Sequence, residues 1–195
     1  PQWYELLDLN VWHDQAWRDP WVFRHPETGK FHAFITARCN YGPTEGRGVI
    51  GHARSDDLIH WKVLPPVIST GEFGLMSYPQ LVNIHQHYYL LFSAPDSFHS
   101  PQYTKRTGQS SLSGTLYMIA DNPLGPFRFC AKEYLVGDKV GSLYSSKLIK
   151  GSDDNWNVIA FHQFAPDGAF IGELSDPMPV DIDREGNLLV STRIE

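Results

Sequence analysis

Hydrophobic and polar residues alternate along short segments that are separated by turn residues, a pattern typical of β-strands. The first two such segments, residues 20–25 and 30–38, lie on either side of a turn at 26–29. Two more strands are expected at 48–54 and 60–64. Four consecutive strands joined by short connections predict one antiparallel sheet.

The same plan returns twice further along the chain. The second unit is expected to have strands at 79–84, 87–93, 115–120 and near 125–129. The third is expected to have strands at 145–150, 156–161 and 170–174, followed by 180–182 and 188–192. No segment shows helical periodicity over the 11 or more residues that would indicate a helix. The sequence therefore predicts an all-β protein, a β-propeller of four-stranded antiparallel blades.

The three units together predict one propeller domain over residues 1–195, with blades at approximately 18–66, 76–130 and 143–193. Closed propellers typically have about four to eight blades, because fewer wedge-shaped sheets leave hydrophobic faces open. Three blades are therefore expected to be part of a larger propeller, with the other blades upstream.

Composition and charge narrow the classes of function. The net charge is −6 and no basic stripe appears, which makes a nucleic-acid partner unexpected. No apolar run approaches the roughly 18 residues that span a membrane, and no signal peptide precedes the first strand. Cys39 and Cys130 are too few for a disulfide framework, although one bridge is possible. A soluble protein is expected, with its compartment and oligomeric state left open.

Polar residues recur where the first strand of each unit begins. These starts read Trp17-Arg18-Asp19-Pro20, Ser77-Tyr78-Pro79 and Tyr144-Ser145-Ser146. Because the innermost strands of a propeller begin around its central channel, the three starts are expected to line one pocket. Only the first start carries a carboxylate, Asp19.

The residues from Trp17 to Pro20, followed by a strand pair and then by Ala-Arg-Ser-Asp-Asp-Leu-Ile-His-Trp at 53–61, resemble a known family. They are similar to the five-bladed propeller glycoside hydrolases of family 32 and their relatives in families 43 and 68. The segment 172–188 resembles the end of that catalytic propeller. The resemblance covers nearly the whole chain as the last three of five blades, and it implies a carbohydrate partner.

The family works with three acids, and the resemblance carries over only one of them to its expected place. It implies that Asp19 stabilises the transition state by holding sugar hydroxyls, with Arg18 beside it. The position of the acid/base glutamate falls on Ser77, and the nucleophile's motif is absent. A serine does not protonate a leaving oxygen near neutral pH. Glu72, five residues earlier, is the candidate substitute acid/base.

Two hypotheses for function follow. The first is a glycoside hydrolase that acts on a furanoside of the fructoside type, with Asp19 and Glu72 as catalytic residues. Its substrate-binding residues would be Trp17, Arg18, Ser77, Tyr78, Tyr144 and Ser145. The alternative is a degenerate, non-catalytic propeller that binds a glycan or a protein.

Each candidate also has a purely structural interpretation. Asp19 could cap a turn, although the adjoining Arg18 favours a site. Tyr78 and Tyr144 either stack on a sugar ring or pack against the protein. His162, in an apolar strand, is expected to be a buried histidine with its hydrogen bonds satisfied.

The segment 96–113 is expected to be a solvated surface loop or, alternatively, a functional lid. No Cys/His cluster has zinc spacing and no glycine-rich phosphate loop follows a strand, so no metal or cofactor is expected.

Overall fold

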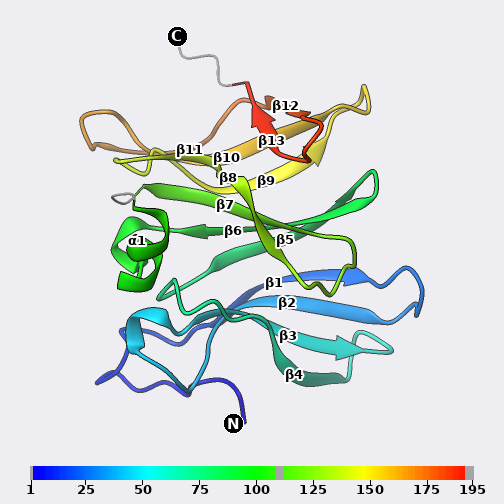
Figure 1. Cartoon of the computed structure of the whole chain (residues 1–195), viewed down its shortest axis with the longest axis vertical. Coiled ribbons are helices and arrows are strands. Elements are labelled where there is room, and N and C mark those ends of the chain that lie inside the picture. The colour runs from blue at the N-terminus through cyan, green and yellow to red at the C-terminus, as the bar shows by residue number, and fades with distance from the viewer. Residues whose placement is uncertain (1, 109–111, 192–195) are drawn as a thin grey trace.

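The computed structural model describes residues 2–108 and 112–191 of the chain. Its three antiparallel sheets lie one above another along the longest axis, in the order in which they occur in the sequence (Figure 1). The predicted all-β architecture of β-propeller blades is confirmed.

The first sheet is the predicted four-stranded meander. Its strands, in spatial and sequence order, are β1 (Trp17–Arg24), β2 (Phe31–Arg38), β3 (Gly48–Ser55) and β4 (Trp61–Ile68). A single 3-10 turn, η1 (Thr44–Gly46), lies between β2 and β3. Residues 2–16, the approach segment, run alongside this sheet and form one isolated bridge, between Tyr4 and Cys39.

The second sheet follows the same order and is longer than the sequence indicated. Its strands are β5 (Ser77–Ile84), β6 (His87–Ala94), β7 (Ser113–Ala120) and β8 (Arg128–Asp138). Between β6 and β7, where a polar loop was expected, the chain forms η2 (Asp96–Phe98) and the short helix α1 (Pro101–Thr107). The Ser100 side chain accepts the N–H of Tyr103 at the start of α1, and Gly108 ends it with a φ of 62°.

The third sheet departs from the plan at its third position. Its strands are β9 (Leu143–Lys150), β10 (Trp156–Phe164), β11 (Phe170–Leu174), β12 (Met178–Ile182) and β13 (Leu188–Val190). Both β11 and β12 pair with β10, one at each end of it, and β13 pairs with β12. At the break, Ser175 bonds Ala160 of β10 through its N–H and its hydroxyl. Pro177, which has no N–H, lies two residues after Ser175.

The two largest hydrophobic clusters of the core are layers between neighbouring sheets. The layer between the first and second sheets includes Phe34, Ile50, Leu90 and Phe92, all fully buried. The layer between the second and third sheets includes Leu91, Leu148 and Val158. Burying each such side chain contributes about 1.5–3 kcal/mol, so the packing of sheet on sheet fixes where the strand starts lie.

Two predictions about single residues are not borne out. Cys39 and Cys130 are both free, so the possible bridge is absent. His162 is half-buried rather than buried, and its Nδ1 lies 3.5 Å from Glu173 Oε1. His162 pairs with Leu143 of β9 and with Glu173 of β11, and β11 is itself mostly exposed, so this end of the sheet stays beside solvent.

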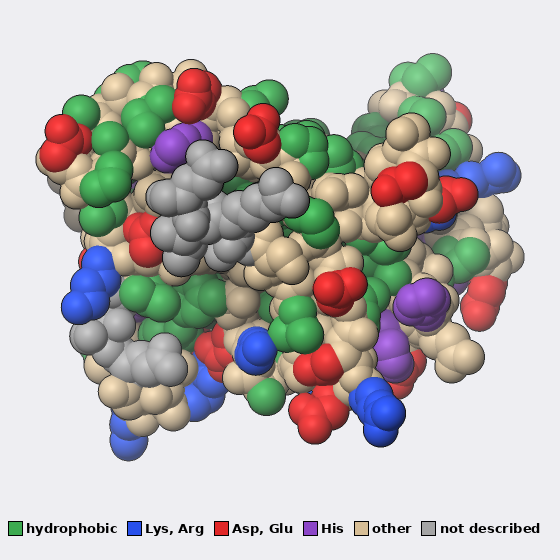
Figure 2. Space-filling view, turned by 90° about the horizontal axis from the view of Figure 1, so that it is seen from above, with side chains coloured by type: hydrophobic (Ala, Val, Ile, Leu, Met, Phe, Trp, Pro, Cys, Tyr) green, Lys and Arg blue, Asp and Glu red, His purple; other side chains and the backbone are tan. Residues whose placement is uncertain are grey.

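The surface carries mixed charge. Viewed from above, acidic and basic side chains are scattered among hydrophobic ones (Figure 2). Among the described residues, no helix is long and apolar enough to cross a membrane.

Candidate functional site

The first strand of each sheet has a left-handed residue at the same place near its start. These residues, with φ of 54°, 54° and 52°, are Asp19, Tyr78 and Ser145. Each lies at an irregularity where the pairing between the first and second strands shifts by a residue. The left-handed conformation costs a non-glycine residue about 1–3 kcal/mol and is concentrated at functional sites. The three starts therefore share one backbone geometry and present different side chains.

Hydroxyl groups on the second strands hold these bulges in place. Thr36 Oγ1 of β2 accepts the N–H of Tyr78 at 3.0 Å, and Ser93 Oγ of β6 accepts the N–H of Ser145 at 3.1 Å. The Thr36 hydroxyl also donates to Asp19 Oδ2 at 3.2 Å. The Asp19 carboxylate is thus tied through one buried threonine to the backbone of the next sheet.

Five of the residues predicted for the site come together at these starts. The rings of Tyr78 and Tyr144 meet edge to face, with centroids 6.1 Å apart. Burial raises the pKa of Tyr144, and Tyr78 and Asp19 add to this rise. A hydrogen bond with Ser77 and the charge of Arg18 act in the opposite direction. All four of the other residues, Arg18, Asp19, Ser77 and Tyr78, therefore lie close enough to affect the pKa of Tyr144. Its phenol stays protonated at neutral pH.

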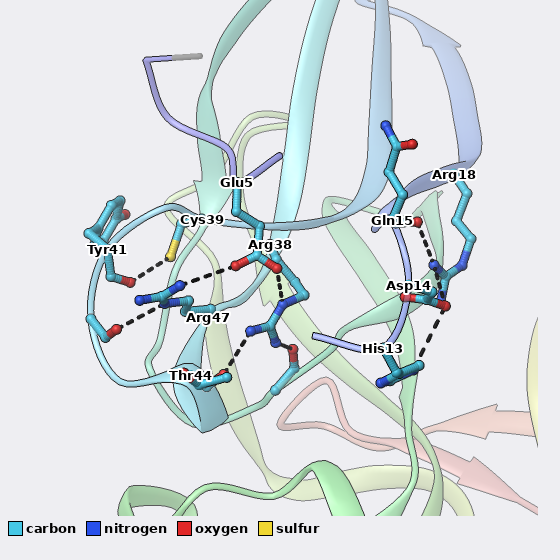
Figure 3. Close-up of polar contacts among 12 residues, drawn as sticks. Glu5, His13, Asp14, Gln15, Arg18, Arg38, Cys39, Tyr41, Thr44 and Arg47 are labelled. Atoms are coloured by element: carbon cyan, nitrogen blue, oxygen red, sulfur yellow. Dashed lines mark hydrogen bonds and ion pairs between the residues drawn. The ribbon is translucent and has the colours of Figure 1, made fainter. Parts of the chain in front are cut away.

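The approach segment holds Arg18 in position (Figure 3). Arg18 Nη1 lies 3.1 Å from Asp14 Oδ2 and donates to the carbonyl of Gln15 at 2.9 Å. Arg18 Nε lies 3.6 Å from Asp19 Oδ2. The guanidinium therefore bridges two carboxylates, and Asp14 joins the cluster as a residue that the sequence did not single out.

Lys147 of β9 is a second addition to the cluster. Its Nζ donates to the carbonyls of Tyr78 at 2.6 Å and Pro79 at 3.3 Å. It lies 5.9 Å from the centre of the Trp21 ring. Burial lowers the pKa of Lys147 to about 8, and the nearby Asp19 carboxylate opposes this shift.

Trp17 lies apart from the cluster. Neighbouring residues of a strand point to opposite faces of the sheet, so Trp17 is on the face opposite Arg18. Its ring packs edge to face on Tyr4, with centroids 4.8 Å apart. The predicted contact of Trp17 with substrate at the shared pocket has no support in this arrangement.

Glu72 is also placed elsewhere. Its carboxylate, with the side chain 7% exposed, accepts two hydrogen bonds from Arg106 of α1, at 2.7 and 2.9 Å. Arg106 also bonds Glu133 of β8. Among the described residues no contact joins Glu72 to Asp19 or Ser77. The ion pair with Arg106 explains why, since it anchors α1 to the segment before β5.

Within the described part of the chain, no three His, Cys, Asp or Glu side chains are grouped so that they could hold a metal ion. Two open hollows on the surface lie away from the cluster, at the turn 24–29 and beside Arg106 and Glu133.

Three residues of the cluster were missed by sequence reasoning. Thr36 interrupts an apolar strand with a polar side chain, a weak signal that could have indicated a buried hydrogen bond. Asp14, four residues before Arg18, has the spacing of an ion pair only if the chain bends there. Lys147 had no signal, because its partners are nearly 70 residues away.

No protein-family model and no curated protein matches the sequence. Solved structures do match. The inulosucrase from Halalkalicoccus jeotgali bound to kestose matches with a TM-score of 0.72 and 20% identity, over 89% of this chain and 49% of that one. The catalytic domain of the Microbacterium saccharophilum K-1 β-fructofuranosidase matches with a TM-score of 0.73 and 14% identity, over 97% of this chain and 49% of that one.

A third similar structure, the levansucrase of Bacillus subtilis, has a TM-score of 0.71 and 12% identity, over 92% of this chain and 50% of that one. The chain thus spans about half the length of the structures it matches. At such low identity the likeness establishes a common fold. The resemblance to the β-propeller glycoside hydrolases of families 32 and 68 is therefore confirmed at the level of the fold.

Proposed function

We propose that this chain forms a site that binds a fructoside and cleaves its glycosidic bond, with Asp19 holding sugar hydroxyls and stabilising positive charge at the anomeric centre. The observation that carries the proposal is the convergence of Asp19, Arg18, Ser77, Tyr78 and Tyr144 at three strand starts. It occurs in a fold shared with a fructofuranosidase, an inulosucrase and a levansucrase.

The chemistry of these groups suits a sugar. Asp19 Oδ2 is taken by Thr36 and Arg18, whereas no described donor contacts Asp19 Oδ1. A carboxylate oxygen accepts hydrogen bonds from sugar hydroxyls, and a charge-assisted bond of this kind contributes about 1.5–3 kcal/mol. The half-exposed ring of Tyr78 offers an apolar face with a polar tip beside it.

The same carboxylate favours bond cleavage. The transition state of glycoside hydrolysis has oxocarbenium character, and a fixed negative charge beside it lowers its energy. Thr36 and Arg18 fix the carboxylate before substrate arrives, so little reorganisation is needed at the moment of reaction.

The second candidate function is binding without turnover. It is favoured by one observation: the start of β5 presents the Ser77 hydroxyl and no carboxyl group. Glu72, which was expected to supply a carboxyl group there, is bonded to Arg106 instead.

The experiment compares the full chain with Asp19→Asn on a panel of fructosides and arabinosides, by calorimetry and product analysis. Asparagine tolerates the left-handed backbone, so the variant removes charge and keeps the fold. We expect Asp19→Asn to bind the fructoside that the wild type prefers at least about tenfold more weakly. We also expect the variant to show no turnover of it.

Asp56→Asn, at an exposed turn of the same sheet, is the matched control and should behave as wild type. If the wild type and Asp56→Asn turn the sugar over and Asp19→Asn does not, the hypothesis of binding without turnover is excluded. Binding without turnover would leave the second candidate, and no binding to any sugar of the panel would overturn both.

A further inference from the structure

An amine reaches into the cluster from the third sheet. Lys147 lies on β9, yet its ammonium group bonds the carbonyls of Tyr78 and Pro79, which directly follow Ser77 on β5. An ammonium group has three donors, and two of them are used by these carbonyls. Within the described residues no acceptor takes the third, which leaves one N–H for a ligand.

The groups around this amine come from all three inner strands. Asp19 of β1 acts electrostatically on both Lys147 and Tyr144. Arg18 is bound to Asp19, and Tyr78 contributes its backbone carbonyl and its ring. Burial lowers the pKa of Lys147 to about 8, so the amine is mostly protonated at neutral pH and releases its proton much more readily than a solvated lysine.

Cleavage of a glycosidic bond near neutral pH requires a proton for the leaving oxygen. The other groups of the cluster do not supply one. The Arg18 guanidinium does not lose its proton in proteins, and burial raises the pKa of Tyr144. Asp19 accepts the Thr36 hydroxyl and lies beside Arg18, in the role of charge stabiliser proposed above.

We propose that Lys147 is the general acid of this site, the group that protonates the glycosidic oxygen of the fructoside. The proposal rests on the function proposed above. The two hydrogen bonds to backbone carbonyls position the Lys147 ammonium group for this role, because they hold it between the second and third sheets.

The proton and electron balance is complete with water as the nucleophile. The N–H bond of Lys147 breaks and its proton joins the glycosidic oxygen. The bond between the anomeric carbon and that oxygen breaks, and its electron pair stays on the oxygen of the departing alcohol. Positive charge at the anomeric centre faces Asp19. Water adds to the anomeric carbon, and its proton returns to the neutral amine of Lys147.

The test uses two variants and two substrates. Lys147→Arg keeps the positive charge and donors to the same carbonyls but gives up no proton, whereas Lys147→Met removes the charge. One substrate is an alkyl fructoside, whose leaving oxygen needs a proton. The other is a fructoside with a 4-nitrophenol leaving group, which departs without one. Lys62→Arg, on an exposed position of β4, is the matched control.

We expect both variants to lose about 100-fold or more in kcat on the alkyl fructoside and to keep a nearly normal kcat on the nitrophenyl fructoside. Sugar affinity should change little in Lys147→Arg. In the wild type, kcat on the alkyl fructoside should fall above about pH 8, while kcat on the nitrophenyl fructoside should not.

Equal losses on both substrates would overturn the proposal, because they indicate a structural role for the lysine. An unchanged Lys147→Arg would overturn it as well. A wild type that binds the sugars and cleaves neither would overturn the general acid and leave the binding site. A wild type that binds no sugar would instead remove the proposed function itself.

Discussion

Two arginine–carboxylate groups lie side by side on the first sheet, and they differ in how completely their donors are used (Figure 3). The Arg38 side chain is fully buried and bonds Glu5 and the carbonyls of Gly74 and Thr44. The Trp12 ring covers it, with the guanidinium carbon 3.6 Å from the ring centre. Every part of this arginine is engaged by the protein.

Arg18 is 35% exposed, and its contacts with Asp14 and Asp19 lie at 3.1 and 3.6 Å. A charge that is buried must be fully paired, whereas a charge beside solvent can keep some capacity for a ligand. The same pair of residue types is therefore structural at Arg38 and available for binding at Arg18. Three predictions follow from this difference, with the largest expected effect first.

Arg38→Met should lower the free energy of unfolding by about 3–5 kcal/mol, because it leaves the Glu5 carboxylate without its main partner in the interior. Urea denaturation followed by circular dichroism measures this change. The control is Arg47→Met, which removes the half-buried second partner of Glu5 and should cost less than half as much. A loss below about 1 kcal/mol in Arg38→Met would contradict the structural role.

The first sheet also buries a pair of histidines that has no carboxylate beside it in the described part of the chain. We expect this pair, unlike the paired Arg38, to make the stability of the protein depend on pH. His32 Nδ1 and His52 Nε2 lie 2.8 Å apart in the same sheet, and no described carboxylate contacts either ring. Burial lowers the pKa of both histidines to about 4. The charge of His25 lowers the pKa of His32 further, and the charge of His32 lowers the pKa of His52 further.

The unfolded chain binds these protons below pH 6.5 and the folded chain only near pH 4, so stability falls as pH falls between those values. At pH 5 the loss should be on the order of 2 kcal/mol for each histidine relative to pH 7. Urea unfolding at the two pH values measures it. His52→Gln should show a smaller loss, and the exposed-turn variant His85→Asn should match the wild type. An equal loss in all three proteins would assign the pH dependence to other groups.

Arg18→Gln should change stability by less than about 1 kcal/mol, since the arginine is partly solvated, and should weaken fructoside binding about tenfold. Calorimetry measures the affinity and thermal unfolding the stability. Trp17→Phe is the neighbour on the opposite face and should bind the sugar within about twofold of wild type. If Trp17→Phe weakens binding more than Arg18→Gln does, the sugar lies on the other face of the sheet.

Much of the fold was predictable because each strand carries its own signal. Alternation over a few residues predicted β2, β3, β5 and β6 nearly to their ends, and the repeated plan predicted three sheets. Signals failed where a strand depends on a distant partner. β8 continues to Asp138 along β7, and β11 and β12 divide one edge of β10.

The candidate site was also predictable only in part. That Asp19, Ser77, Tyr78 and Tyr144 converge followed from the plan of the fold, because strand starts meet at its centre. The position of Glu72 did not follow, since Arg106 draws it away from a place 34 residues distant in the sequence.

The sequence by itself determined the β-strands, their division into three sheets and the residues at each strand start, because these depend on local alternation and turn residues. Only the tertiary structure decided which polar groups are shared between sheets. Lys147 at Tyr78, Thr36 at Tyr78 and Asp14 at Arg18 are contacts made once sheet packs on sheet or the approach segment folds back. Hydrogen bonds and burial act over a few ångströms in space whatever the separation along the chain, and no local pattern records them.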